Sequence, residues 1–203
     1  LPLPALLYIP LQQHIGAPAE VLVKEGDLVK KGQMIARSGG TLSAPQHAPT
    51  SGRIQAITAV PAPHPSGLAQ TTIILEPDGR DQWGELPAPI ADPFTADPHT
   101  INERVAASGI VGMGGATFPS VVKLMPPKDT EVHTVILNGC ECEPFLTCDH
   151  RLMLEQPERV VAGAGYIRDI IGAKRVVIAV ESNKPDAADA LRAAAGDGIE
   201  IVV

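Results

Sequence analysis

Aromatic side chains, long apolar runs and positive charge are all scarce in this sequence. Phe, Trp and Tyr make up 3% of the 203 residues, so the core must be built from aliphatic side chains. No apolar run approaches the roughly 20 residues that a membrane-spanning helix needs. The net charge of −7 disfavours a nucleic-acid partner, because such a partner requires a basic face. Hydrophobic residues still amount to 44%, which is enough for a packed core.

Cysteine is also scarce, and the three cysteines are crowded together. Cys140, Cys142 and Cys148 are too few and too close for a secreted disulfide framework, which favours a reducing, cytoplasmic setting. Their spacing lacks the paired C-x₂-C of zinc and iron–sulfur sites, so we expect ordinary thiols and no metal. The N-terminal LPLPALLYIP has no charged region and no cleavage site, so no signal peptide is expected. The closing IEIVV is typical of a strand, and we expect a piece of a longer protein.

Short strands separated by glycine and proline dominate residues 1–76, where helical periodicity is absent. The runs AEVLVKEGDLV, KKGQMIARSGG, SGRIQAITAV and TTIILEP indicate a small all-β barrel or sandwich. Residues 77–99 are rich in proline and are expected to form an irregular linker, which Trp83 pins to a domain surface.

Helices and strands alternate over residues 100–203, which predicts a doubly wound α/β domain. Thr100 and Glu103 form a capping box for a first helix, and Pro119 opens a second. Buried parallel strands are expected at 132–138, 175–181 and 199–203. Helices are expected at 157–171, closed by Gly172, and at 184–195, capped by Asn183.

The N-terminal pattern V-K-E-G-D-x-V-x-K-G-Q, followed by A-P-x-S-G, resembles the biotinyl and lipoyl carrier family. This resemblance implies a barrel-sandwich hybrid whose carrier lysine would lie in residues 36–46. No lysine occurs between Lys31 and Lys123, so nothing there can be acylated. We expect the shape of a carrier without its chemistry, and a structural or docking role.

A glycine-rich loop, SGIVGMGGATFP, precedes the helix expected at Pro119. Glycines let the backbone approach a ligand, and N–H groups at a helix start favour phosphate. The loop is neither G-x-G-x-x-G nor a Walker loop, and a plain tight turn is the alternative. Lys123 lies about one helical turn after Pro119 and could reach back to an anion.

A second polar cluster directly follows the strand VILN: Asn138, Glu141 and Glu143. Ligands of α/β sheets bind beyond the carboxyl ends of strands, where an Asn offers both a donor and an acceptor. The alternative is a turn whose side chains bond nearby backbone. Two such loops in adjacent units predict one shared crevice.

The segments GIVGMGGATFPSVVKL and VILNGCECEPFLTCDHRLM closely resemble the RnfC subunit of the Rnf (Rsx) ion-translocating electron-transport complex. They are similar, more distantly, to the FMN- and NADH-binding subunit of respiratory complex I. IPLQQHIGAPAEVLVKEGD and HAPTSGRIQAI match RnfC too, so the likeness covers essentially the whole chain.

The resemblance implies a Rossmann-like domain that binds non-covalent FMN and NADH and transfers hydride between them. It assigns no catalytic residue. It also implies an NADH:ferredoxin-type oxidoreductase, peripheral on the cytoplasmic face of the bacterial inner membrane and attached through partner Rnf subunits. [4Fe-4S] clusters would lie in a C-terminal region outside this sequence, so the flavin site here would be incomplete. The residues implied to bind cofactor are Gly112, Gly114, Gly115, Ala116, Phe118, Lys123, Asn138, Glu141 and Glu143.

Met113, Cys140 and Cys148 depart from the pattern of these relatives. Met113 stands where the complex I relative has arginine, which favours a second hypothesis: a non-enzymatic scaffold with a degenerate flavin site. A carrier protein is a third hypothesis, disfavoured by the missing lysine.

Overall fold

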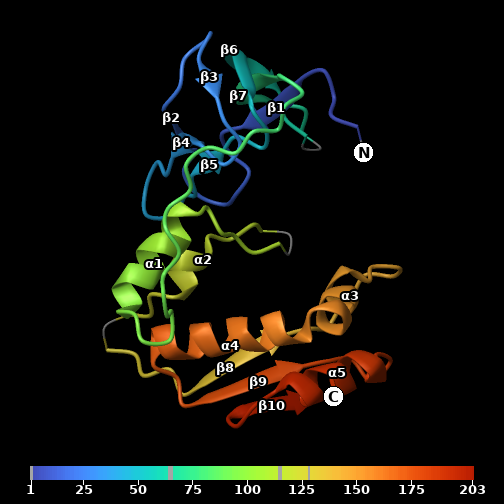
Figure 1. The fold of residues 1–203 in the computed structure, drawn as a ribbon. Helices are drawn as coiled ribbons and strands as arrows, with labels where there is room; N and C mark the ends of the chain where they lie inside the picture. The colour runs from blue at the N-terminus through green and yellow to red at the C-terminus, as the bar shows by residue number, and fades with distance from the viewer. Residues whose placement is uncertain (1, 64–65, 114–115, 128) are drawn as a thin grey trace. The chain divides into compact units, whose positions relative to one another are not determined.

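The computed structural model describes residues 2–63, 66–113, 116–127 and 129–203. The chain forms two compact units (Figure 1). The first unit comprises Leu1–Ile90 and Glu103–Lys123, and the second comprises Ala91–Asn102 and Leu124–Val203. No helix in the described ranges is long and apolar enough to cross a bilayer.

The first unit contains a β-sandwich of two small antiparallel sheets. One sheet has the order β1-β7-β6-β3 and the other β2-β4-β5. Ile35, Ile54, Ile73 and Leu75 are fully buried in its core, so the core is aliphatic as the scarcity of aromatics predicts. The strands are β1 (Leu7–Pro10), β2 (Glu20–Val21), β3 (Leu28–Val29), β4 (Met34–Arg37), β5 (Gln46–His47), β6 (Gly52–Pro61) and β7 (Ala69–Pro77).

The segment after the sandwich is fixed to it by Trp83, as expected. Trp83 pairs with Lys31 in an isolated β-bridge, and the Lys31 ammonium lies 4.9 Å from the centre of its ring. A Cβ at Gly32 would approach the indole to 2.9 Å, so the bare Cα of this residue admits the ring.

Helix α1 (Pro98–Ala107) begins two residues before the predicted capping box at Thr100. Asp97 takes the capping role instead, since its Oδ2 accepts a hydrogen bond from the Thr100 N–H at 3.2 Å. Pro98 then occupies the first helical position, where its missing N–H costs nothing. Helix α2 (Ser120–Lys123) follows Pro119 as predicted.

The second unit is built on a parallel sheet of three described strands in the order β10-β9-β8. These are β8 (Thr134–Asn138), β9 (Arg175–Ala179) and β10 (Ile199–Val202). The described strands are added in one direction only. One half of a doubly wound sheet has this order, so the reversal of strand order that completes such a sheet stays a prediction.

The sequence predicts two of the helices beside this sheet. Helix α4 (Pro157–Ile171) has the predicted bounds, and Gly172 closes it with a left-handed φ of 68°. Helix α5 (Pro185–Ala194) begins later than predicted. Lys184, not Asn183, occupies its N-cap position, and its side chain makes no capping bond.

Helix α3 (Cys148–Glu155) is not predicted from the sequence. Thr147 stands at its N-cap position but makes no side-chain capping bond, so the usual local signal is absent.

One face of the sheet carries the core of the second unit. Val135, Val176 and Ile178 pack there with Leu191 of α5. The opposite face of β8 is exposed, because Ile136 retains 67% of its accessible surface.

Replacing Leu191 with Ala is expected to destabilise the second unit by about 2–5 kcal/mol, because it leaves a cavity in a closed core. Leu152→Ala on α3 is the matched control: this side chain is 47% exposed, so a change within about 0.5 kcal/mol is expected. Chemical denaturation of both variants checks this, and equal losses would contradict the assigned core.

Candidate functional site

The two ends of the glycine-rich loop in the first unit are held together by backbone pairing. Val111 and Pro119 form an antiparallel bridge, and the Gly112 N–H donates to the Phe118 carbonyl at 2.8 Å. The Ser120 N–H donates to the Ile110 carbonyl at 2.9 Å. Met113, Ala116 and Thr117 lie beyond these bonds, and Gly114 and Gly115 lie outside the described residues.

Three residues predicted to bind cofactor meet at the base of this loop. The Lys123 ammonium lies 5.6 Å from the centre of the Phe118 ring. A Cβ added to Gly112 would come within 3.4 Å of the same nitrogen. A cation and an aromatic face are therefore presented next to bare backbone.

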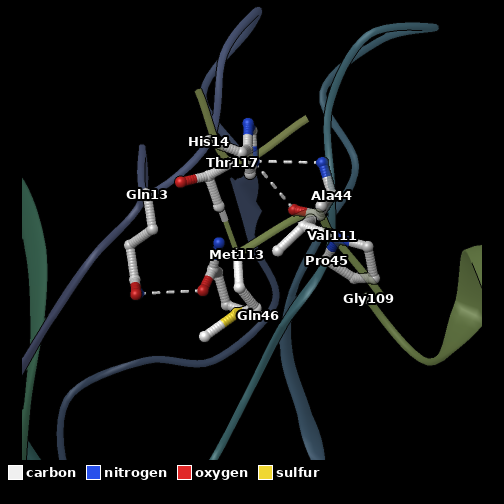
Figure 2. A pocket seen from close by; sticks show the side chains of 9 residues that line it. All are labelled: Gln13, His14, Ala44, Pro45, Gln46, Gly109, Val111, Met113 and Thr117. Carbon is white, nitrogen blue, oxygen red and sulfur yellow. Dashed lines mark hydrogen bonds between the residues drawn. The ribbon is translucent and has the colours of Figure 1, made fainter. Parts of the chain in front are cut away.

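A hollow of about 390 Å³ adjoins the loop within the first unit (Figure 2). Met113 and Thr117 line it from the loop, and Gln13 and Gln46 line it from the sandwich, joined by a hydrogen bond of 2.9 Å. Ala116 lines a neighbouring hollow. The Met113 side chain is 94% exposed, so it contributes little to the packing of the loop.

In the second unit the chain leaves β8 at Gly139 and reaches α3 through residues 139–147, called here the turn after β8. The Gly139 N–H donates to the Ala179 carbonyl at 2.8 Å, and a Cβ would meet that oxygen at 2.8 Å and Met153 Sδ at 2.7 Å. Only glycine fits here. Asn138 Oδ1 accepts a hydrogen bond from the Cys140 N–H at 3.1 Å, and the Asn138 amide nitrogen takes no part in this bond. Glu143 is exposed further along the turn.

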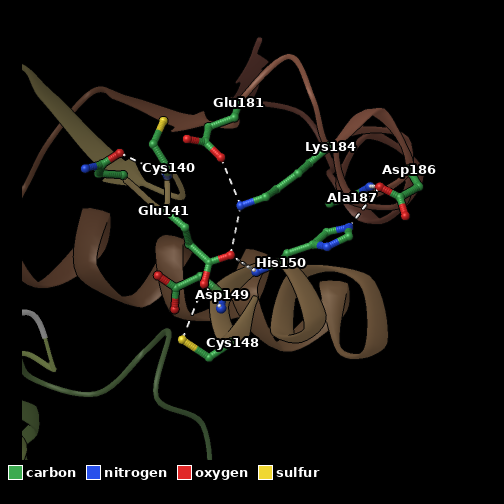
Figure 3. A network of polar contacts seen from close by, with 10 residues as sticks. Cys140, Glu141, Cys148, Asp149, His150, Glu181, Lys184, Asp186 and Ala187 are labelled. Atoms are coloured by element: carbon green, nitrogen blue, oxygen red, sulfur yellow. Dashed lines mark hydrogen bonds and ion pairs between the residues drawn. The ribbon is translucent and has the colours of Figure 1, made fainter. Parts of the chain in front are cut away.

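Glu141 points inward, and both of its carboxylate oxygens are bonded (Figure 3). Oε1 accepts the Asp149 N–H at 2.9 Å and the Cys148 thiol at 3.3 Å. Oε2 accepts the His150 N–H at 3.1 Å and the Lys184 ammonium at 2.9 Å. The carboxylate thus caps the first turn of α3 from seven residues upstream, which explains why local sequence signals miss this helix.

Lys184 joins the ends of two neighbouring strands. Its ammonium pairs with Glu141 after β8 and, also at 2.9 Å, with Glu181 after β9. The side chains of Glu141 and Lys184 are 3% and 10% exposed. A second contact joins α3 to α5, since the His150 ring lies 2.9 Å from Asp186 Oδ1.

These contacts change the acidity of Glu141. Burial acts to raise its pKa, but the hydrogen bonds from Lys184 and from the Asp149 and His150 amides outweigh it and lower the pKa from 4.5 to about 2. The bond to Glu141 raises the pKa of Cys148, which keeps that thiol protonated.

Glu141, Cys148 and Asp149 are the one group among the described residues with possible metal-ligand atoms all within 4.8 Å of one another. The Glu141 oxygens are already occupied by four donors, one of them the Cys148 thiol itself. This group is satisfied internally, and we assign no metal to it.

The predicted site residues therefore gather in two places. Gly112, Phe118 and Lys123 meet in the first unit, while Asn138, Glu141 and Glu143 share the turn after β8 in the second. That the two groups form one crevice stays a prediction. Sequence reasoning misses Lys184, Glu181, His150 and Asp186, because their roles come from contacts across strand ends and carry no local spacing signal.

Comparison with known proteins defines the class. Residues 1–80 match the family described as the RnfC barrel sandwich hybrid domain, and residues 105–202 match the Nuo51 FMN-binding domain. This confirms the predicted order of a barrel-sandwich hybrid followed by a Rossmann-like α/β domain.

The chain belongs to the RnfC family, whose members are subunits of ion-translocating oxidoreductase complexes. It is 54% identical over 94% of its length to the member from Rhodobacter capsulatus, and 43% identical over 97% to the one from Pseudomonas aeruginosa. It spans 37% and 25% of those proteins, respectively. A crystal structure of NAD⁺-reducing [NiFe]-hydrogenase aligns with 52% of this chain and 20% of that chain, at 26% identity and a TM-score of 0.49.

Gly139→Ala is expected to destabilise the second unit by about 1–3 kcal/mol, because the Ala179 carbonyl cannot move away from the new methyl group. Gly163→Ala within α4 is the control. A Cβ there meets nothing within 4 Å, so a gain of about 0.5–1 kcal/mol is expected. Thermal unfolding distinguishes the two variants, and a neutral Gly139→Ala would show that the turn is not constrained.

The lowered pKa of Glu141 predicts how stability depends on pH. A carboxylate whose pKa falls on folding contributes stability above its unfolded pKa, and this contribution disappears as the pH falls from about 4.5 towards 2. The difference in unfolding free energy between wild type and Glu141→Gln should shrink over this window. Urea titrations at several pH values test this, and a difference independent of pH would contradict the assigned bonds.

Proposed function

We propose that this chain supplies the FMN- and NADH-binding part of an electron-input subunit in an Rnf-type ion-translocating complex. The observation that carries the proposal is the match of residues 105–202 to an FMN-binding domain, because this range includes both the glycine loop and the turn after β8. The close likeness to members of such complexes over nearly the whole chain supports the same assignment.

The residues present suit a phosphate-bearing flavin. Lys123 offers a cation beside the uncluttered backbone of Gly112, where an added side chain would crowd it. Phe118 offers an aromatic face for stacking. In the turn after β8, the Asn138 amide can pair with the polar edge of a ring, and the exposed Glu143 carboxylate can accept bonds from ribose hydroxyls.

In this proposal the binding residues are the predicted ones: Gly112, Gly114, Gly115, Ala116, Phe118, Lys123, Asn138 and Glu143. Glu141 takes part through the turn that it holds. When bound, FMN would supply the chemistry for hydride transfer from NADH, and the chain would contribute alignment of the two rings rather than an acid or a base.

The complex supplies the context for this reaction. [4Fe-4S] clusters elsewhere in the complex would supply one-electron acceptors for the flavin, and the protein attaches to the cytoplasmic face of the inner membrane through partner subunits. The NADH-dependent reduction of a ferredoxin-type acceptor is the corresponding activity of the whole assembly.

A scaffold with a degenerate flavin site is the second candidate function. The observation that favours it is Met113, which stands exposed at the tip of the loop where a flavin anchor is expected. Such a scaffold would dock on other subunits without binding FMN.

Titration with FMN separates the two candidates. Quenching of flavin fluorescence is expected for the full-length wild-type protein, and Lys123→Met should weaken binding on the order of tenfold, because it removes a charge-assisted contact. Lys174→Met is the matched control, since Lys174 forms an exposed ion pair with Glu131. Absence of quenching would favour the scaffold, and an adduct in the intact mass would revive the carrier hypothesis.

A further inference from the structure

We infer that Lys184 is a positioning residue of the ligand site, acting through Glu141 to fix the turn that carries Asn138 and Glu143. The inference rests on the proposed function, because it assigns Lys184 a role at that same site. It goes beyond that function in naming a residue that need not touch the ligand.

The first support is the closed bonding of Glu141. Its two oxygens accept four donors, from Lys184, the Asp149 and His150 amides and the Cys148 thiol. A carboxylate has about four lone-pair sites, so this one has none left for a ligand. Glu141 therefore serves the protein itself, although it lies between Asn138 and Glu143 in sequence.

The second support is the position of Lys184 at the ends of two neighbouring strands. Glu141 lies three residues after β8, and Glu181 lies two residues after β9. One ammonium forms an ion pair with each carboxylate, at 2.9 Å in both cases. Ligands of parallel sheets bind outside the carboxyl ends of the strands, so Lys184 joins the two loops that border that edge.

The third support is burial and charge. With Glu141 3% and Lys184 10% exposed at the side chain, neither group is well solvated if the other is removed. Removing the cation leaves two carboxylates facing each other without compensation, and the simplest relief is for Glu141 to turn outward into water. That movement would break the hydrogen bonds from the Asp149 and His150 N–H groups to Glu141. These bonds hold the start of α3, so the turn after β8 would become more mobile.

Hydrogen exchange of the ligand-free chain, followed by mass spectrometry, measures how strongly Lys184 protects the amides of this turn from opening. Lys184→Met is expected to speed exchange in peptides covering residues 138–150 on the order of tenfold, because local opening becomes easier. Lys174→Met removes an exposed ammonium and should leave these peptides unchanged. Lys184→Arg keeps the positive charge, so its exchange rates in these peptides should remain close to those of the wild type. If Lys184→Met does not fold, faster exchange in Lys184→Arg would overturn the inference.

A double-mutant cycle tests whether Lys184 acts through Glu141. In a Glu141→Gln background the carboxylate charge is already gone, so adding Lys184→Met should have much less effect on exchange than it has in the wild type. The second readout is the FMN affinity of the full-length protein by fluorescence, which Lys184→Met should weaken on the order of tenfold because the turn is misplaced.

Each outcome decides one part of the inference. Unchanged exchange in Lys184→Met, or effects that add fully in the double variant, would overturn the role of Lys184 as an anchor of the turn. Faster exchange with unchanged FMN affinity would overturn its role in positioning the ligand site. Absence of FMN binding in the wild type would contradict the proposed function and the positioning role that rests on it, while exchange would still decide the hold on the turn.

Discussion

A single carboxylate, that of Glu141, organises the end of the sheet where a ligand is expected to bind. It caps α3, bonds a thiol and pairs with Lys184, all at once. The other described contacts within the turn after β8 are local: the close approach at Gly139, the bond from the Cys140 N–H to Asn138 Oδ1 and the bond from the Leu146 N–H to the Glu143 carbonyl. Without the ion pair, a buried charge would face an unscreened interior, so the turn and the start of α3 depend on it together.

Neighbouring residues of this short segment have different roles: some fix the path of the chain, and others are exposed to a ligand. Glu141 and Gly139 face inward and define the path of the chain, whereas Asn138 and Glu143 are exposed. A rigid turn that presents polar groups costs less ordering on ligand binding than a flexible one. The glycine loop is also held in place before a ligand binds, because the pairing of Val111 with Pro119 closes its base.

Sequence reasoning is most successful where the signals are local. Hydrophobic runs locate all three described strands of the second unit, and Gly172 marks the end of α4. It fails where contacts are distant. Helix α3 is capped from Glu141, and Lys184 finds its partner 43 residues away, so neither leaves a spacing pattern.

The most direct measurement is a crystal structure of the full-length protein soaked with FMN. The account predicts flavin density in contact with Asn138, while the Glu141 carboxylate keeps its bond to the Lys184 ammonium. A Glu141 side chain turned towards the flavin and away from Lys184 would contradict it.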